Sequence, residues 1–151
     1  MTHTTHQQHF PSPAHKLLNA FAGTWRTSGM MPAQHSPVMI TGTDTYEWLP
    51  GGYFLLHTVD VMMGEERRQS IEVIGYDTTA GHYTMHAFDD KGTASVMTAE
   101  CRHDVWTFQG DTLRFSGEFD PAHKVISGVW ETLLDGHWTH LMNIALNKQV
   151  W

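Results

Sequence analysis

The sequence predicts an all-β protein, a single closed antiparallel up-and-down barrel of about ten strands with a short N-terminal helix. Three observations predict this fold. After Gly23, apolar residues recur at every second position, as strands with one buried and one solvated face require. Turn-forming residues separate these runs at intervals of roughly a dozen residues, which is typical of an antiparallel meander. No second helical layer is available to cover a flat sheet, and closure removes its exposed edges.

The helix is predicted to start at Ser12-Pro13, which combines an N-cap residue with proline at the first helical position. Leu17, Leu18 and Phe21 then follow at helical spacing and give one apolar face over about two turns. Gly23 ends this helix, and we expect no other long one.

The strands follow the helix in order and are bounded by turns rich in Gly, Pro and Asp. The clearest strand places Leu113, Phe115 and Phe119 on one face, with Arg114 and Glu118 on the other. The predicted strands are 24–31, 38–49, 53–63, 69–76, 82–88, 93–101, 105–109, 112–119, 124–133 and 137–147.

Composition excludes several classes of protein. The 151 residues carry a formal net charge of −7, and their nine Lys and Arg form no basic stripe, so nucleic acid is not an expected partner. Cys101 is the only cysteine, so the chain has no internal disulfide and no CxxC-type metal spacing.

The sequence also predicts where the domain lies and where the protein works. No apolar run approaches the ~20 residues of a membrane span, and the N-terminus lacks the pattern of a secretory signal. We therefore expect a cytoplasmic protein. Residues 1–11, with His3, His6 and His9, are predicted to be a flexible His-rich tail, and residues 12–151 to form the barrel domain.

The stretch Gly23-Thr24-Trp25 follows the short helix and resembles the Gly-x-Trp signature of lipocalins and other calycin-type barrels. A longer series of motifs is similar to a bacterial family of calycin-like barrels of unknown function: "GTW", "GGYFLL" at 51–56, "GYD" at 75–77 and "DxxG" at 89–92. This resemblance spans about residues 15–148. It implies that Trp25 packs across the closed end of the barrel as a structural plug.

The stretch "GTWRTSG" is also similar to the Gly-x-Trp-x-Gly-x-Gly opening of nitrobindins, which are ten-stranded haem barrels. Here Thr27 stands in place of the middle glycine. The resemblance implies a haem ligand near the C-terminal strand, where this chain has His140 in "THLM". No other haem-binding residue matches by spacing. The residues themselves therefore predict no cofactor, and haem is an alternative that rests on the resemblance.

A ten-stranded barrel is wider than the ~8-stranded barrel whose interior side chains just fill it, so we expect a ligand-sized cavity. Alternation turns His57 and His140 inward among apolar residues. These two histidines either orient a ligand or are neutral and hydrogen-bonded inside a mostly filled core. The candidate ligand-binding residues on inward faces or in aromatic and Met walls are His57, His140, Met142, Met85, Tyr53 and Trp130.

Two orientations stay open in the pattern. In the strand 82–88 the more apolar set contains Met85 and turns His86 to solvent, but the opposite register would bury His86. Both faces of the strand 124–133 are apolar enough to point inward. Glu131 is then either an ordinary surface charge or an acid/base partner of His57 or His140.

Three hypotheses follow, in this order. The first is binding of a small hydrophobic or amphipathic ligand in the barrel cavity. The second is nitrobindin-like haem binding through His140, and the third is a small enzyme that uses His57 and His140 with Glu131 for proton transfer. No metal-binding motif is present in the sequence. The oligomeric state stays open, and a homodimer formed through an outer face of the barrel is one alternative.

Overall fold

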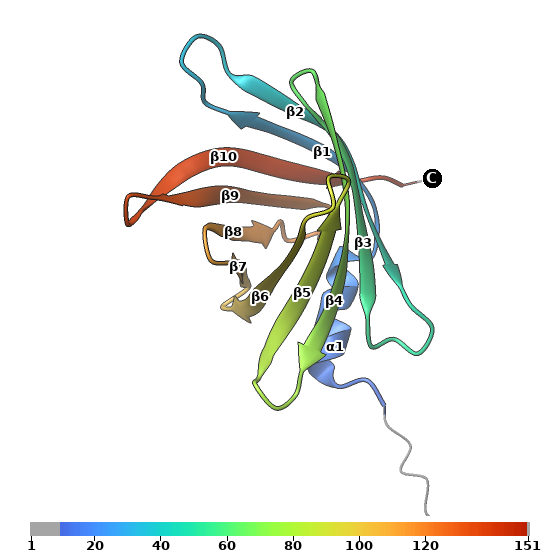
Figure 1. The fold of residues 1–151 in the computed structure, drawn as a ribbon. Helices are drawn as coiled ribbons and strands as arrows, with labels where there is room; N and C mark the ends of the chain where they lie inside the picture. The colour runs from blue at the N-terminus through green and yellow to red at the C-terminus, as the bar shows by residue number, and fades with distance from the viewer. Residues whose placement is uncertain (1–9, 151) are drawn as a thin grey trace, which may run out of the picture.

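The computed structural model describes residues 10–150 and closes ten antiparallel strands into a barrel (Figure 1). The predicted fold class is confirmed. Around the barrel, the order is β1-β10-β9-β8-β7-β6-β5-β4-β3-β2, so each strand pairs with its sequence neighbours and β1 pairs with β10. Residues 1–9, with His3, His6 and His9 of the predicted tail, and Trp151 lie outside the described residues.

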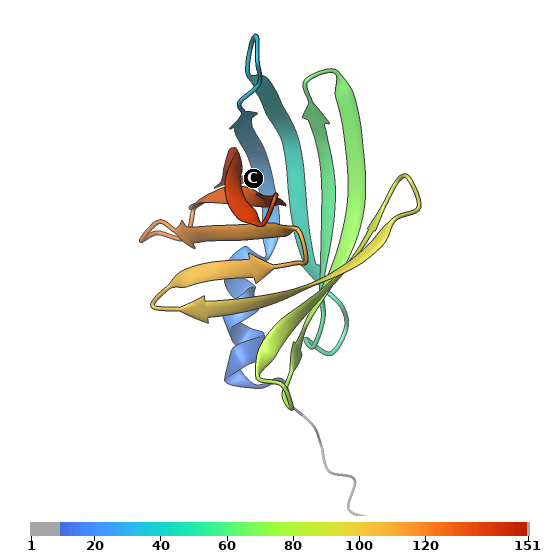
Figure 2. The same cartoon turned by 60° about the vertical axis from the view of Figure 1, so that its left-hand side comes forward.

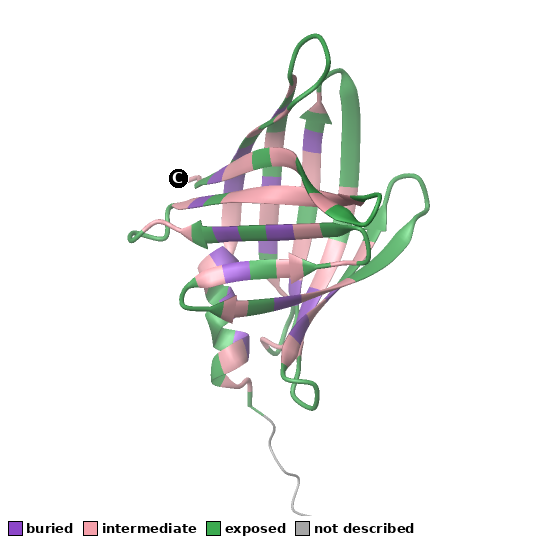
Figure 3. Ribbon diagram, turned by 90° about the vertical axis from the view of Figure 1, so that its left-hand side faces the viewer, coloured by how far each residue is buried: buried purple, intermediate pink, exposed green. Residues whose placement is uncertain are grey.

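A short helix and a 3-10 helix precede the strands. The elements are α1 (Pro13–Leu17), η1 (Leu18–Phe21), β1 (Gly23–Met31), β2 (Val38–Trp48), β3 (Leu55–Met63), β4 (Glu66–Asp77), β5 (His82–Asp89), β6 (Ala94–Arg102), β7 (Val105–Gln109), β8 (Leu113–Phe119), β9 (Val125–Leu134) and β10 (His137–Lys148). Buried and exposed positions alternate along these strands, as the colour bands in Figure 3 show.

The observed strands differ from the predicted ones mainly around β3 and β4. A two-residue hairpin at 64–65 joins these strands, with Gly64 at φ 63°, so β4 starts three residues before the predicted position. At the other end, β3 starts at Leu55, and Tyr53 lies in the preceding loop. The strand alternation on which the inward prediction for Tyr53 depended therefore does not reach that residue.

The up-and-down topology gives the barrel two different ends. The segments 32–37, 64–65, 90–93, 110–112 and 135–136 connect the strands at one end. The helical segment and the connections at 49–54, 78–81, 103–104 and 120–124 lie at the other. Figures 1 and 2 show the β1–β2 and β3–β4 hairpins projecting away from the end that α1 covers.

Aromatic side chains fill the helical end. Phe21 of η1 is buried, and its ring centroid lies 5.0 Å from those of Trp106 and Phe119 and 5.4 Å from that of Tyr46. Trp25 is fully buried, and its Nε1–H donates a hydrogen bond of 2.7 Å to the carbonyl oxygen of Phe21. This bond ties the first strand to the helical segment, and the aromatic contacts seal that end of the barrel.

Two glycines in neighbouring strands leave space for the aromatic ring of Phe115. Gly117 of β8 and Gly128 of β9 lie directly opposite each other. A Cβ atom on either residue would come within 2.5 Å of the Cζ atom of Phe115, whose ring occupies that space. Side chains at these two positions would therefore collide with the ring of Phe115.

Within residues 10–150, the structure contains no helix with the length and apolar character needed to cross a membrane.

Candidate functional site

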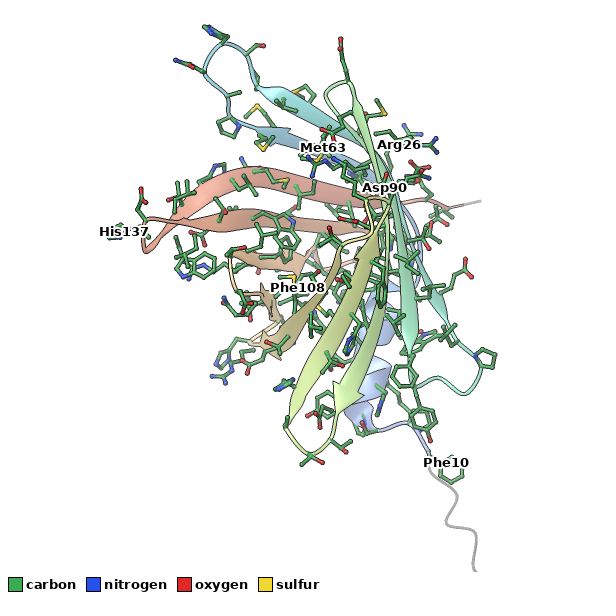
Figure 4. The ribbon with its side chains drawn as sticks, viewed as in Figure 1. Phe10, Arg26, Met63, Asp90, Phe108 and His137 are labelled. Atoms are coloured by element: carbon green, nitrogen blue, oxygen red, sulfur yellow. The ribbon has the colours of Figure 1, made fainter. Side chains whose placement is uncertain are left out.

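The barrel encloses a cavity of about 380 Å³. Its walls are mostly apolar and come from all ten strands, with Phe21 at the helical end. Phe88, Asp89, Thr93 and Leu113 line it at the opposite end and are exposed, so the cavity opens there. Figure 4 labels two of the lining residues, Met63 and Phe108, among the side chains between the walls.

A group of polar side chains lies on the otherwise mostly apolar cavity wall. It consists of Thr27, Asp44, His57 and Glu72, and we call it the acidic cluster. Nε2 of His57 lies 2.6 Å from Oδ1 of Asp44, and Nδ1 of His57 lies 3.1 Å from Oε1 of Glu72. The hydroxyl of Thr27 donates a hydrogen bond to Oδ2 of Asp44. The imidazole is therefore held between two carboxylates on the cavity wall.

Strand register brings these side chains together. His57 of β3 lies opposite Glu72 of β4 on one side and opposite Tyr46 of β2 on the other. Asp44 precedes Tyr46 by two residues and therefore points to the same face of β2. The Tyr46 ring stacks on the imidazole of His57, with 4.0 Å between centroids and 6° between planes. Stacking and two hydrogen bonds fix the position of the imidazole.

The two carboxylates decide the charge of His57. Burial by itself lowers the pKa of His57, since it disfavours the imidazolium. The hydrogen bonds and negative charges of Asp44 and Glu72 act in the opposite direction and outweigh burial, so the pKa rises to about 9. His57 is therefore an imidazolium at neutral pH. Burial, together with the charges of Asp44 and Glu72, also raises the pKa of Tyr46, which keeps its phenol protonated.

This shift predicts how stability depends on pH. The folded-state pKa of His57 is about 9, above the ordinary value of 6.5, so its contribution is complete below about pH 6.5 and disappears as the pH rises through 9. We expect the free energy of unfolding to fall by on the order of 3 kcal/mol between pH 6.5 and 9. Urea titrations at both pH values measure this fall, which the His57→Leu variant should lack. An equal fall in the free energy of unfolding in the two proteins would contradict the prediction.

Most predicted ligand contacts lie on the cavity wall. His57, Met85, Trp130 and Met142 line the cavity, each from a different strand. The register of β5 is the more apolar one: Met85 is buried, and His86 is exposed. Tyr53 does not line the cavity, and its ring instead contacts that of His15 in α1, 5.3 Å away.

His140 lies on the outer face of the barrel. It is exposed, does not line the cavity, and its Nε2 lies 2.9 Å from Oδ1 of Asn143. The predicted inward orientation was wrong because of a β-bulge in β10: His140 pairs with Glu131 and Met142 with Trp130, so Leu141 is an extra residue. The bulge turns Met142 inward but leaves His140 on the outer face.

Glu131 also lies outside the cavity. Its Oε1 accepts a hydrogen bond of 2.9 Å from Nε of Arg114. The guanidinium of Arg114 also lies 4.4 Å from the centroid of a Trp138 ring. These three residues form a patch on β8, β9 and β10. The structure therefore does not bring Glu131 and His140 together with His57 in the cavity.

The residues do not fit a haem held by His140 inside the cavity, because that imidazole lies on the outer face of β10. His57 is the histidine on the cavity wall, and its two ring nitrogens are both bound to carboxylates. In the part of the chain that the structure describes, no group of three or more His, Cys, Asp or Glu side chains could hold a metal ion.

The sequence interpretation missed three members of the acidic cluster, Thr27, Asp44 and Glu72. Asp44 could have been found, because alternation places it on one face with Ile40, Tyr46 and Trp48 in "ITGTDTYEW". For Glu72, the hydrophobic pattern of the strand indicates an outward side chain, which is the wrong orientation. Ile71 and Val73 flank it and look like the buried set, yet Ile71 is exposed and Glu72 lines the cavity.

The family described as "Protein of unknown function (DUF1579)" matches residues 10–124 of the chain. The chain belongs to the DUF1579 family. The match covers the helical segment, β1 to β8 and every member of the acidic cluster. A comparison of this DUF1579 protein with curated proteins found no match.

Among solved structures, the DUF1579 barrel resembles the crystal structure of Rv2717c from M. tuberculosis, with a TM-score of 0.67. The two chains are 13% identical, and the alignment covers 92% of this chain and 99% of the other. At this identity the likeness concerns the fold alone.

Proposed function

We propose that this DUF1579 barrel binds a small, mostly apolar molecule with one polar group inside its cavity. The observation that carries the proposal is a cavity of about 380 Å³ with mostly apolar walls, into which the carboxylate–histidine group of Asp44, His57 and Glu72 is built. This combination is typical of sites in which apolar contacts supply affinity and a few polar groups fix orientation. We also group the barrel with calycin-like folds, on the Gly-x-Trp motif at Gly23 and Trp25.

The chemistry of His57 favours binding over proton transfer. A general base must be unprotonated at the working pH, and the pKa of His57 is about 9. Both of its ring nitrogens also donate hydrogen bonds to carboxylates, so neither faces a substrate without a partner. Glu131, the acid/base partner considered in the sequence, lies outside the cavity. The acidic cluster therefore suits recognition of a polar group.

Filling the cavity should abolish binding. Ala87 of β5 lines the cavity and lies directly opposite Glu72 of β4. We expect Ala87→Trp to raise the Kd of the neutral fluorescent probe N-phenyl-1-naphthylamine by roughly ten-fold or more, because the indole would occupy the space the probe needs. A fluorescence titration measures this change. The matched control is His86→Trp, which places the same side chain on the exposed face of β5.

The two variants separate cavity binding from binding to the barrel surface. The His86→Trp protein should bind the probe with the wild-type Kd. Equal binding by wild type and Ala87→Trp would contradict the proposal, as would a wild-type protein that binds neither this probe nor other small apolar molecules.

A further inference from the structure

The cavity wall carries more negative than positive charge. The Asp, Glu and His residues that line the cavity are Asp44, His57, Glu72 and Asp89, and no Lys or Arg lines it within residues 10–150. Two carboxylates surround one imidazolium in the acidic cluster, which leaves one negative charge in excess. Asp89 adds a further carboxylate at the open end.

One oxygen of the acidic cluster has no hydrogen-bond partner among residues 10–150. Both ring nitrogens of His57 and both carboxylate oxygens of Asp44 are engaged. Glu72 uses Oε1 for His57, whereas Oε2 makes no hydrogen bond with residues 10–150. No fully buried side-chain nitrogen or oxygen in this part of the chain lacks a partner, so Oε2 is accessible. Since Glu72 lines the cavity, a bound molecule can reach this oxygen.

An ionised carboxylate oxygen accepts hydrogen bonds and does not donate them. The group that pairs with Oε2 must therefore be a donor, and a positively charged donor forms the stronger bond. The apolar and aromatic walls, among them Phe108 and Trp130, lower the local dielectric and strengthen this preference. Aromatic faces also attract cations. An anionic head group would find no available cation on the wall, because Asp44 and Glu72 already hold His57.

We infer that the ligand of this barrel is an amphipathic cation, an alkyl- or arylalkylamine whose ammonium group pairs with Glu72. The inference rests on the proposed function and specifies the chemical class of the ligand. The apolar part lies against the cavity walls, and the ammonium group donates to Oε2 of Glu72. Asp89 at the open end and the net charge of −7 attract cations toward the cavity.

Three probes of matched chain length test the inference by isothermal titration calorimetry at pH 7.5: n-octylammonium, 1-octanol and octanoate. We expect wild type to bind octylammonium roughly ten-fold or more tightly than octanoate, with octanol between them. Glu72→Gln keeps the shape and the acceptor for His57 but removes the charge. It should weaken octylammonium binding by roughly ten-fold and leave octanol binding nearly unchanged. Glu47→Gln, at an exposed position of β2, is the control.

The outcomes distinguish the inference from the proposed function. Equal affinity for octylammonium and octanoate overturns the amine assignment, and an ammonium preference that persists in Glu72→Gln overturns the role of Glu72. In both cases octanol binding upholds the cavity as a binding site. If wild type binds neither the octyl probes nor N-phenyl-1-naphthylamine, the proposed function itself fails.

Discussion

His57→Leu should lower the free energy of unfolding by about 3–5 kcal/mol, because it removes the only cation between two carboxylates. Asp44 and Glu72 would then face each other across a mostly apolar wall, with side chains only 9% and 13% exposed. An aliphatic side chain between them offers neither carboxylate a hydrogen-bond donor, and their like charges would repel. Urea denaturation at pH 7 measures the loss. A change of less than about 1 kcal/mol would show that the ion pairs do not stabilise the barrel.

Two further variants define the cause of this loss. His86→Leu removes an exposed histidine from the neighbouring region of β5 and should change stability by less than about 0.5 kcal/mol. Replacing the whole acidic cluster, by Thr27→Val, Asp44→Leu, His57→Leu and Glu72→Leu together, should recover most of the loss, because apolar residues in place of a buried ion pair are often neutral or stabilising. Recovery of stability without ammonium binding would indicate that the cluster serves recognition.

Trp25→Ala is expected to cost about 3–5 kcal/mol, the usual range for truncating a buried tryptophan. Trp25 is fully buried, and its Nε1–H bonds to the carbonyl oxygen of Phe21. The variant loses the packing of the indole and the link between β1 and η1. It also leaves that carbonyl without its donor. Chemical denaturation gives the stability, and hydrogen exchange at the amides of 14–21 should show faster opening of the helical segment.

The control for this variant is Trp138→Ala. Trp138 lies partly exposed, and its described ring contact is with the guanidinium of Arg114. Its removal should cost about 1 kcal/mol, the size of an exposed cation–π contact. If both tryptophan variants lose the same stability, the closed end of the barrel does not depend on Trp25.

Much of the fold could be predicted because strand alternation and turn residues are local signals. The run around Phe115 and the turn at Asp89 follow directly from residue type and spacing. The hairpin at Gly64 was missed because the polar residues after it resemble a loop, although they form the start of β4. The cytoplasmic location and the homodimer stay predictions from the sequence.

The site was harder to predict because it depends on the register between strands. His57 could be recognised as an inward histidine, but its partners come from β2 and β4 and no local pattern joins them. In the sequence, Thr27 attracted attention only because it replaces a glycine of the nitrobindin motif, yet its hydroxyl donates a hydrogen bond to Asp44. The bulge at Leu141 has no recognisable sequence pattern, and it reverses the orientation expected for His140.

The pairing of β1 with β10 has a consequence for biosynthesis. Trp25 lies opposite Lys148. The first strand of the barrel to be synthesised, β1, therefore completes its pairing only after β10, the last of the ten strands, has been made. Contacts between such distant segments form slowly, since a long loop must close before they contribute. During translation the free edge of β1 therefore stays unpaired until β10 has left the ribosome, and the cavity is completed only after synthesis of its final strand.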